Sequence, residues 1–385
     1  GWVRDALLGE VHSDLDFATD ARPEESAEIL RGAAGGKVWT TGIDFGTVGA
    51  RRGKVRVEVT TFRTEVYPGD SRHPRVSYST DLDIDLSRRD FTINAMAIAL
   101  PQVELVDPFG GLGDLAVRRI RTPLPPEVSF SDDPLRMLRA LRFLSSLDFE
   151  IDPGVLAGIA AMAERLRIVS RERIRDELSK LMVGRVPWRA LELAAETGLA
   201  EEFLPELPRL RLEQDPVHRH KEVFSHTLAV LENVCRLETG PPDPALRLAA
   251  VLHDIGKPKT RQITPEGVTF HHHEVVGAEM TQARLRELRY PADLVEEIRQ
   301  LVYLHLRFHS YRLGWTDRAV RRYVRDAGAL LGKLNILVRA DCTTRNPRKA
   351  MQLSRRMDEL EARIRELAAS EELSRLRPAL DGHEV

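Results

Sequence analysis

Two carboxylates stand two residues apart near the start of the chain. Asp14 and Asp16 alternate with Leu15 and Phe17, and side chains at i and i+2 of a strand project from one face. We therefore expect the two acids to point together, with Leu15 and Phe17 facing a core. Carboxylates this close repel unless a cation lies between them, and Mg²⁺ takes one or two carboxylates plus substrate phosphate oxygens. The pattern favours phosphoryl or nucleotidyl transfer with metal ions; a polar edge strand or a turn is the alternative.

Glu58 is a candidate third carboxylate. Residues 54–60 alternate and carry β-branched side chains, which predicts a strand. Val57 and Val59 share one face of it, and Glu58 shares the other with Arg56. Glu58 is therefore expected to join the metal site or to polarise the primer hydroxyl, and a cross-strand pair with an arginine is the alternative.

Asp133 and Arg136 are three residues apart, which makes their side chains neighbours on a helix. An ionised Asp only accepts hydrogen bonds and Arg only donates them. Adenine and cytosine both present an amino donor beside a ring-nitrogen acceptor, so this pair would select A and C without a template. Guanine and uracil would leave buried groups unpaired, which costs about 1–3 kcal/mol per group. The alternative is a surface ion pair worth under about 0.5 kcal/mol.

Two further arginines follow on the same expected helix. Arg139 continues the stripe from Asp133 through Arg136. Arg142 lies about half a turn from Asp133, because each three-residue step rotates the position by roughly −60°. Helix geometry alone therefore supports a ligand contact for Arg139 better than for Arg142.

The composition is that of a globular protein with more than one domain. The chain has 385 residues, 30% charged and 42% hydrophobic, a length at which two or more domains are expected. Its net charge of −2 excludes a uniformly basic nucleic-acid coat but not local arginine clusters. Cys235 and Cys342 are the only cysteines, which excludes a disulfide framework and suits the cytoplasm. We find no signal peptide and no apolar run that could cross a membrane.

Strands and helices are mixed up to about residue 120, and the pattern is almost wholly helical from residue 131 onward. Residues 63–86 show little periodicity, and we expect a mobile functional loop there. Residues 205–216 indicate a boundary. Residues 353–367 combine helical spacing with dense charge, which predicts an exposed or partner-facing helix.

Residues 1–5 read Gly-Trp-Val-Arg-Asp and precede Asp14 and Asp16. They resemble the signature of class II tRNA nucleotidyltransferases (CCA-adding enzymes) and bacterial poly(A) polymerases, which runs Gly-Gly-x-Val-Arg-Asp, Leu-Leu-Gly, Asp-x-Asp. The first glycine and the strand before it are absent here, so we expect an N-terminal truncation. Three more segments resemble the family's Arg-Arg-Asp motif, its head–neck hinge and its base-reading helix, namely residues 87–95, 107–115 and 132–143. In the last of these, Asp132 stands where the family has glutamate.

The resemblance implies an α/β nucleotidyltransferase head of polymerase-β type, followed by an all-helical neck and body that include an HD domain. We expect the head at 1–121, the neck with the nucleobase-reading helix at 122–205, the HD-type metal-binding domain at 206–350, and a C-terminal helix with a partial tail at 351–385. Asp14 and Asp16 would hold Mg²⁺. The incoming CTP or ATP would be bound by residues from the matched motifs, namely Gly1, Arg4, Arg89, Asp90, Asp133, Arg136, Arg139 and Arg142.

The C-terminal half resembles HD-type metal phosphohydrolases. The adjacent pair His253-Asp254 ends an apolar helix, and the HD pattern adds an upstream histidine and a distant aspartate, which His226 and Asp341 match. His273 best resembles the extra ligand of HD proteins. Imidazole and carboxylate ligands suit Mn, Fe, Ni or Mg better than a thiolate-type zinc site, so we expect a divalent transition metal or Mg²⁺.

The implied function is template-independent addition of C and A nucleotides to the 3′ end of tRNA. Poly(A) polymerase activity, or addition of only CC or only A, is the alternative within the class. The alternative of another class is an HD metal phosphohydrolase with an RNA-binding head. The expected partners are tRNA, CTP and ATP, with no membrane, and the sequence leaves the oligomeric state open.

Overall fold

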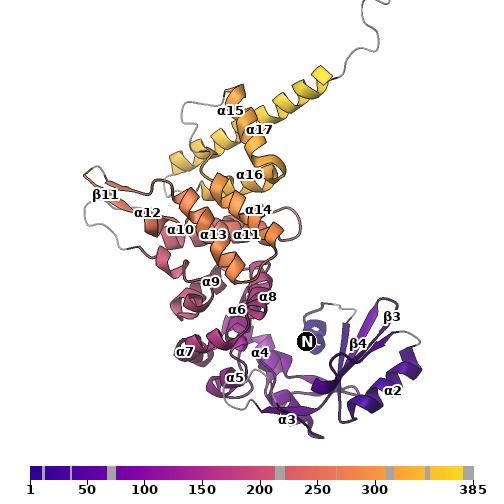
Figure 1. Ribbon diagram of the computed structural model, residues 1–385. Coiled ribbons are helices and arrows are strands. Elements are labelled where there is room, and N and C mark those ends of the chain that lie inside the picture. The colour runs from indigo at the N-terminus through magenta and orange to yellow at the C-terminus, as the bar shows by residue number, and fades with distance from the viewer. Residues whose placement is uncertain are drawn as a thin grey trace, which may run out of the picture. The chain divides into compact units, whose positions relative to one another are not determined.

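The computed structural model describes residues 1–10, 14–34, 37–66, 75–212, 222–265, 267–308, 316–342 and 347–375 (Figure 1). It divides into two compact units, Gly1–Leu181 with Glu196–Glu202, and Met182–Ala195 with Phe203–Val385. Among the described residues, no helix is long and apolar enough to span a membrane. The four-domain division expected from the sequence stays a prediction.

The first unit begins with a mixed four-stranded sheet, which confirms the predicted α/β head. The strand order is β1-β4-β3-β2, with β1 parallel to β4 and the other pairs antiparallel. Its elements are α1 (Trp2–Leu7), β1 (Asp14–Thr19), α2 (Pro23–Ala34), β2 (Val38–Trp39), β3 (Thr47–Arg52) and β4 (Val55–Thr61). Helix α2 packs on β3, and Val48 and Ala50 of that strand are buried.

Strand β1 is an edge strand of this sheet, which corrects one expectation. Phe17 was expected in a core, but it is 40% exposed. A strand paired on one side only leaves its side chains less covered than a central strand does. Side chains on β1 therefore alternate between the two faces as expected, but the face that carries Phe17 is not covered.

Residues 63–86 were expected to form a mobile loop, and this expectation is wrong for the part that the structure describes. β5 (Arg63–Val66) pairs antiparallel with β6 (Arg75–Tyr78), and α3 (Leu82–Ser87) follows. Asp81 caps α3 by accepting hydrogen bonds from the backbone N–H groups of Asp83 and Ile84. Residues 67–74 lie outside the described residues.

The rest of the first unit is a hairpin followed by short helices. It comprises β7 (Ala97–Ala99), β8 (Glu104–Val106), α4 (Gly111–Ala116), β9 (Arg119–Ile120), α5 (Pro126–Asp132), α6 (Leu135–Leu147), β10 (Glu150–Ile151), α7 (Pro153–Met162) and α8 (Arg171–Met182). The core face of α6 is apolar, with Met137, Leu138, Leu141 and Leu144 fully buried. That burial fixes the rotation of α6 and hence the directions of its arginines.

The second unit is helical, as predicted. Its elements are α9 (Pro187–Glu196), α10 (Val223–Leu237), α11 (Pro244–Leu252), α12 (Lys257–Thr260), β11 (Gln262–Thr264), β12 (Gly267–Thr269), α13 (His273–Glu287), α14 (Ala292–Leu304), α15 (Asp317–Ala327), α16 (Leu331–Asp341) and α17 (Pro347–Arg375). Helix α17 covers residues 353–367, and it buries Met357 and Leu360 completely within its own unit. It is therefore not exposed on all sides.

Candidate functional site

The strand register brings three carboxylates of the head to one face of the sheet. Asp14 pairs with Arg56, and Asp16 pairs with Glu58, across the parallel strands β1 and β4. Paired residues of neighbouring strands share a face, and so do residues two apart on one strand. Asp14, Asp16 and Glu58 therefore lie on the same side, as the sequence predicted for the two aspartates.

This face is open to solvent. Asp14 and Asp16 are both exposed, and Glu58 forms an ion pair with Arg56 at 2.5 Å between Oε1 and Nη2. Among the described residues, these three acids do not form a group whose ligand atoms all lie within 4.8 Å of one another. Exposed carboxylate oxygens are suitable ligands for a hard cation such as Mg²⁺. The residues thus fit a metal that a phosphate-bearing substrate helps to hold. Glu58 does pair with an arginine, but Arg56 lies on the same strand, so the pair is not the cross-strand pair that was the alternative.

Asn94 links several of the predicted nucleotide-binding residues. Its Oδ1 accepts hydrogen bonds from Arg4 at 2.6 Å and from the backbone nitrogen of Gly1 at 3.1 Å. Its Nδ2 donates to Asp90 at 2.9 Å, and Asp90 accepts from Arg139 at 2.5 Å. Four predicted residues from the chain start, the Arg-Arg-Asp motif and α6 are therefore connected through a side chain for which the sequence predicted no role.

Asp90 is ionised at neutral pH in this network. Burial by itself would raise the pKa of its carboxyl group, but the charge of Arg139 and hydrogen bonds from Asn94 and Arg139 outweigh burial and lower the pKa to about 2. Asp90 is 9% exposed. A buried carboxylate that must stay charged holds its arginine partner in one orientation.

Three arginines surround the ring of Phe143 on α6. The guanidinium carbons of Arg4, Arg139 and Arg142 lie 5.0, 5.8 and 4.0 Å from the ring centroid. Glu177 of α8 is 3% exposed and forms ion pairs with Arg142 at 2.9 Å and Arg139 at 3.4 Å. Arg4 in turn forms an ion pair with Asp5 at 2.5 Å, so every arginine of the cluster has a carboxylate partner. The cluster therefore presents oriented guanidinium groups, which are the donors that bind phosphate oxygens.

Sequence reasoning missed Phe143 and Glu177 as parts of this site. Glu177 lies in the neck segment that resembles the family, and its charge gave no sign of which arginines it would meet. Arg139 and Arg142 were the sequence signal that could have pointed to Glu177. Two arginines three residues apart on a half-buried helix need a nearby carboxylate to balance their charge.

Asp133 and Arg136 do not share one helix, which corrects the predicted geometry. Asp133 follows the end of α5 in an extended conformation, and Pro134 is the N-cap of α6, which begins at Leu135. A residue before proline is biased away from the helical region, and this bias separates α5 from α6. The Asp133 carbonyl still accepts from the Arg136 N–H at 3.0 Å, so the two residues remain one turn apart.

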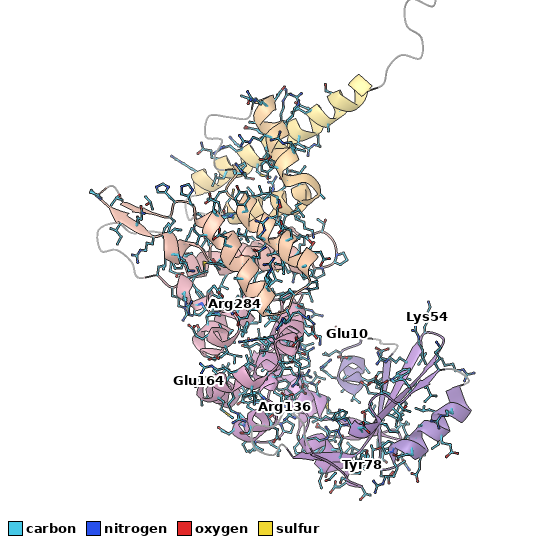
Figure 2. All side chains as sticks on the ribbon, viewed as in Figure 1. Glu10, Lys54, Tyr78, Arg136, Glu164 and Arg284 are labelled. Atoms are coloured by element: carbon cyan, nitrogen blue, oxygen red, sulfur yellow. The ribbon has the colours of Figure 1, made fainter. Side chains whose placement is uncertain are left out.

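The side chains of Asp133 and Arg136 bind other partners instead of each other. Asp133 accepts from the Leu135 N–H at 3.1 Å and from Arg173 of α8 at 2.7 Å. Arg136, labelled in Figure 2, donates to Ser129 Oγ at 3.0 Å and to the Arg88 carbonyl at 2.5 Å. The simple surface ion pair is therefore not formed, and each group is oriented separately.

Arg89 lies apart from the Asn94 network. It forms an ion pair with the buried Asp85 of α3 at 2.9 Å, and Arg88 binds the same carboxyl group at 2.6 Å. Arg89 is next to Asp90 in the sequence, but its side chain pairs with Asp85 and does not join the Asn94 network.

The second unit brings all five predicted metal ligands together. His226 Nε2 lies 2.9 Å from Asp341 Oδ1 and 3.6 Å from Asp254 Oδ2. His253 Nε2 and His273 Nε2 lie 3.2 and 3.3 Å from the two oxygens of Asp254. Four of these five residues are buried, namely His226, His253, Asp254 and His273.

His305, directly after α14, is a further member that the prediction left out. Its Nε2 lies 4.0 Å from Asp254 Oδ1, and it is 1% exposed. Asp254 belongs to two ligand groups, one with His226 and His253 and the other with His273 and His305. Helical spacing marks His305 no more strongly than the other histidines, which is why the sequence alone could not select it. His309 lies outside the described residues.

The histidine tautomers suit a metal. His253, His273 and His305 each place Nδ1 within 2.5–2.8 Å of the carbonyl three residues earlier, which leaves Nε2 as the ligand atom. These three Nε2 atoms are buried and make no hydrogen bond to other described residues. Burial lowers the pKa of His305 to about 3, so its imidazole is neutral. We conclude that the cluster fits a divalent cation.

Gly256 permits the close packing of this cluster. A Cβ atom at this position would lie 2.2 Å from the His273 carbonyl oxygen. The turn after His253-Asp254 can therefore approach α13 only because residue 256 has no side chain.

Comparisons with known proteins identify the domains in which the two sites lie. Residues 1–121 match the Poly A polymerase head domain, residues 148–210 match the probable RNA and SrmB-binding site of polymerase A, and residues 223–368 match the HD domain. A nucleotidyltransferase head and an HD domain both imply use of a divalent metal.

Two relatives and one solved structure show the extent of the similarity. A CCA-adding enzyme of Bacillus licheniformis is 44% identical over 204 residues, 53% of this chain and 50% of the relative, so the chain spans about half of that relative's length in the match. An A-adding tRNA nucleotidyltransferase of Deinococcus radiodurans is 34% identical over 396 residues, covering 100% of this chain and 85% of the relative. The crystal structure of Bacillus stearothermophilus CCA-adding enzyme in complex with CTP has a TM-score of 0.64 and 28% identity, covering 93% of this chain and 77% of that chain.

Proposed function

The chain belongs to the class II tRNA nucleotidyltransferase and poly(A) polymerase family, and on that premise we propose that it adds C and A nucleotides to the 3′ end of tRNA without a template. Its substrates would be CTP, ATP and tRNA. The observation that carries this proposal is the strand register that puts Asp14, Asp16 and Glu58 on one face of the head.

Asp14 and Asp16 would hold Mg²⁺ with the help of the substrate's phosphate oxygens. A bound Mg²⁺ would supply Lewis-acid chemistry, lowering the pKa of the attacking 3′-hydroxyl and neutralising charge on the leaving pyrophosphate. Arg4, Arg139 and Arg142 would bind the triphosphate, since their guanidinium groups gather around one ring. The network through Asn94, Asp90 and Glu177 would keep these arginines oriented.

Asp133 and Arg136 would read the base, each with capacity left after its structural contacts. A carboxylate has about four acceptor positions and a guanidinium has five donors. Asp133 uses two oxygens on Leu135 and Arg173, and Arg136 directs its terminal nitrogens to Ser129 and Arg88. The amino group of A or C would donate to Asp133 while the ring nitrogen accepts from Arg136.

The test is an incorporation assay on two tRNAs, one that lacks CCA and one that already ends in CC. Each is incubated with CTP, with ATP and with both, and products are separated at single-nucleotide resolution. Addition of three nucleotides to the first tRNA and one to the second supports the proposal. A long A tail would indicate poly(A) polymerase activity instead, and no extension of either tRNA would overturn the proposal.

A-only addition is a second candidate, because one relative that matches this whole chain is an A-adding tRNA nucleotidyltransferase. The same assay separates the two candidates. An A-adding enzyme extends only the tRNA that ends in CC, and CTP alone yields no product with either tRNA.

The buried cluster supports a separate hydrolytic activity on phosphate esters. Its four imidazoles and two carboxylates suit Mn, Fe, Ni or Mg, and two groups share Asp254. The metal-to-protein ratio counts the bound ions, and hydrolysis of p-nitrophenyl phosphate with each metal tests the activity. His253→Ala should abolish hydrolysis and leave nucleotide addition intact; hydrolysis that survives this change would refute the assignment.

A cytoplasmic location is also proposed. Neither Cys235 nor Cys342 forms a disulfide, and reduced cysteines are the rule in that compartment.

A further inference from the structure

The open face of the head sheet carries one row of paired residues that runs from β1 to β2. The register pairs Asp16 of β1 with Glu58 of β4. It then pairs Glu58 with Gly49 of β3, and Gly49 with Trp39 of β2. Paired residues of neighbouring strands share a face, and α2 packs on the opposite side of β3. Trp39 therefore stands on the same open face as the carboxylates.

The ring of Trp39 lies directly on Gly49. A Cβ atom at position 49 would lie 2.3 Å from Cε2 and Cζ2 of the indole and 2.6 Å from its Nε1. Gly49 is buried although this face is open, whereas Trp39 is only half-buried. The indole can lie here only because residue 49 has no side chain. Its position on β3 is two strands from Asp16, which is about 10 Å at the usual strand spacing.

Arg56 joins the ring to the carboxylates. Its guanidinium carbon lies 5.2 Å from the centroid of the Trp39 ring, and its Nη2 forms the ion pair with Glu58. A cation within about 6 Å of an indole centroid is attracted by the ring. Indole rings and guanidinium planes are the surfaces on which the unpaired bases of RNA stack. Trp39 and Arg56 thus form a platform for a base beside the carboxylates.

Positive charge surrounds this platform. The hairpin of β3 and β4 carries the exposed Arg51, Arg52 and Lys54 near its turn, and Figure 2 shows Lys54 at the tip. Arg51 and Arg56 stand directly opposite each other across the two strands, where like charges destabilise a sheet. Arg51 donates to a neutral acceptor, the Gly53 carbonyl, at 3.1 Å. A phosphate backbone beside the hairpin would relieve this repulsion.

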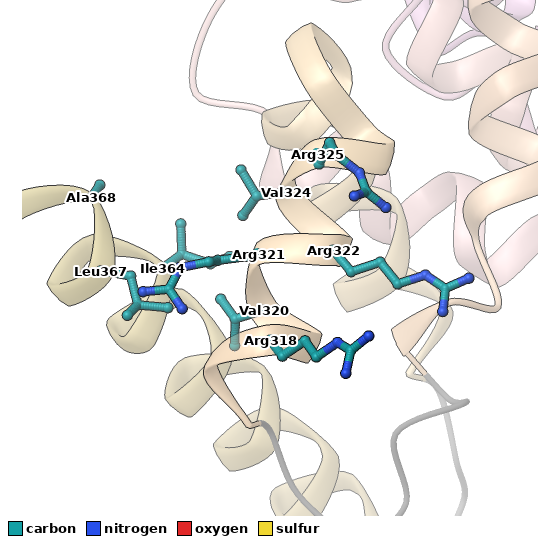
Figure 3. Close-up of a pocket in the computed structure, with 9 residues that line it drawn as sticks. All are labelled: Arg318, Val320, Arg321, Arg322, Val324, Arg325, Ile364, Leu367 and Ala368. Atoms are coloured by element: carbon teal, nitrogen blue, oxygen red, sulfur yellow. The ribbon is translucent and has the colours of Figure 1, made fainter. Parts of the chain in front are cut away.

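Positive charge alone does not mark such a platform elsewhere in the chain. In the second unit, Figure 3 shows Arg318, Arg322 and Arg325 of α15 extending away from the apolar groove between α15 and α17. The described residues that line this groove include no aromatic side chain. Single-stranded nucleic acid is bound where a basic surface and an aromatic ring occur together, as they do on the head sheet.

We propose that Trp39, held on Gly49, stacks against a base at the unpaired 3′ end of the RNA primer. The start of the chain, which is proposed to bind the incoming nucleotide, lies at the other edge of the sheet, because α1 packs on β1. The carboxylates thus stand between the nucleotide and the platform, as transfer from one substrate to the other requires. The inference rests on the proposed function, to which it adds a residue that contacts the primer.

The test compares Trp39→Phe with Trp39→Leu in the full chain. Phenylalanine keeps a ring that can stack, whereas leucine covers Gly49 without one. Trp188→Ala, which removes the half-buried tryptophan of α9, is the control. KM is measured for a tRNA that ends in CC and for ATP, and the melting temperature of each variant is recorded. The two Trp39 variants should melt at the same temperature.

Trp39→Leu should raise the KM for tRNA by about tenfold or more and leave the KM for ATP unchanged, because base–aromatic stacking is lost. Trp39→Phe and Trp188→Ala should both stay close to the wild type. Equal KM values for tRNA in Trp39→Phe and Trp39→Leu overturn the inference, since a role in covering Gly49 predicts them. A rise confined to the KM for ATP also overturns it, since the ring would then contact the incoming nucleotide.

Gly49→Ala is a second variant that keeps the ring and removes its place on β3. The added Cβ would clash with the indole, so the KM for tRNA should rise as it does in Trp39→Leu. A wild-type KM in Gly49→Ala would contradict the proposed platform.

Fluorescence of 2-aminopurine measures stacking without catalysis. The base analogue is placed at the last position of one tRNA and at the penultimate position of another. Binding to the wild type should quench the fluorescence of at least one of them, and Trp39→Leu should remove most of this quenching. Quenching that does not depend on Trp39 at either position would refute only the platform. A chain that shows Trp39-dependent quenching but extends no tRNA would refute only the proposed nucleotide addition.

Discussion

Asp14 and Asp16 are exposed on an edge strand, whereas Asp254 is 1% exposed and lies against four histidines. Exposed carboxylates keep their hydration, so the head can hold its acids in place without a cation. The charged form of Asp254 is stabilised by neighbouring residues of the fold. Burial alone would raise the pKa of Asp254, but the charges of His253 and Lys257 bring this pKa well below its usual value. On the proposed function, a metal ion and the substrate would complete the site in the head, whereas the fold alone brings the residues of the buried cluster together.

The largest expected effect concerns the open site. Asp14→Ala or Asp16→Ala should reduce nucleotide incorporation by about 10³-fold or more, because each removes a ligand of the proposed metal. The melting temperature should stay the same, since both side chains are exposed. Asp20→Ala, an exposed acid directly after β1, is the matched control for incorporation. Full activity in either purified variant would contradict the metal assignment.

Metal binding to the buried histidine and aspartate cluster should raise the free energy of unfolding. A divalent metal at about 100 times its dissociation constant should stabilise the chain by about 2.7 kcal/mol, measured as the rise in melting temperature after a chelator is replaced by metal. His305→Ala should reduce this rise, because it removes one buried ligand atom. Asp14→Ala serves as the control and should retain it. A rise of the same size in His305→Ala would show that this histidine takes no part.

Asp90 predicts acid sensitivity in the first unit. Its pKa is about 2 in the folded chain against an ordinary 3.8, so the unfolded chain takes up the proton first as the pH falls. The stabilising contribution is present above about pH 4 and is lost toward pH 2, and it amounts to about 2 kcal/mol. Urea unfolding from pH 2 to 5 should show a steeper pH dependence for the wild type than for Asp90→Asn. Parallel curves would contradict this account.

The smallest expected effect concerns the choice of base. Arg136→Ala should relax the preference for A and C over G and U by about tenfold, which is about 1.4 kcal/mol. Incorporation rates with all four triphosphates measure this preference. Arg31→Ala, an exposed arginine of α2, is the control. An unchanged preference in Arg136→Ala would remove this residue from base reading.

The sequence predicted the features that depend on local period and failed where tertiary context decides. The shared face of Asp14 and Asp16 follows from the period of a strand, and the register confirms it. The pairing of β5 with β6 was missed because two four-residue strands carry too little periodicity to stand out. Pro134 could have warned that Asp133 precedes a helix instead of lying within it.

Among the ligands, the resemblance to HD proteins identified five of the cluster's members, but not His305. A histidine at the end of an apolar helix is usually a core residue, and only the packing of α14 against α11 and α13 shows that this one faces Asp254. Likewise, the pairing of Glu177 with Arg139 and Arg142 depends on how α8 lies beside α6.

The arginines of α6 wind around the helix, and each meets a partner from a different segment: Arg136 the Arg88 carbonyl, Arg139 the Asp90 carboxylate, and Arg142 the carboxylate of Glu177. Deleting one residue between Arg136 and Arg139 would turn every later side chain by about 100°. Such a change would break two of these pairings at once without altering a single charge. This helix should therefore tolerate conservative replacement during evolution but almost no change of length.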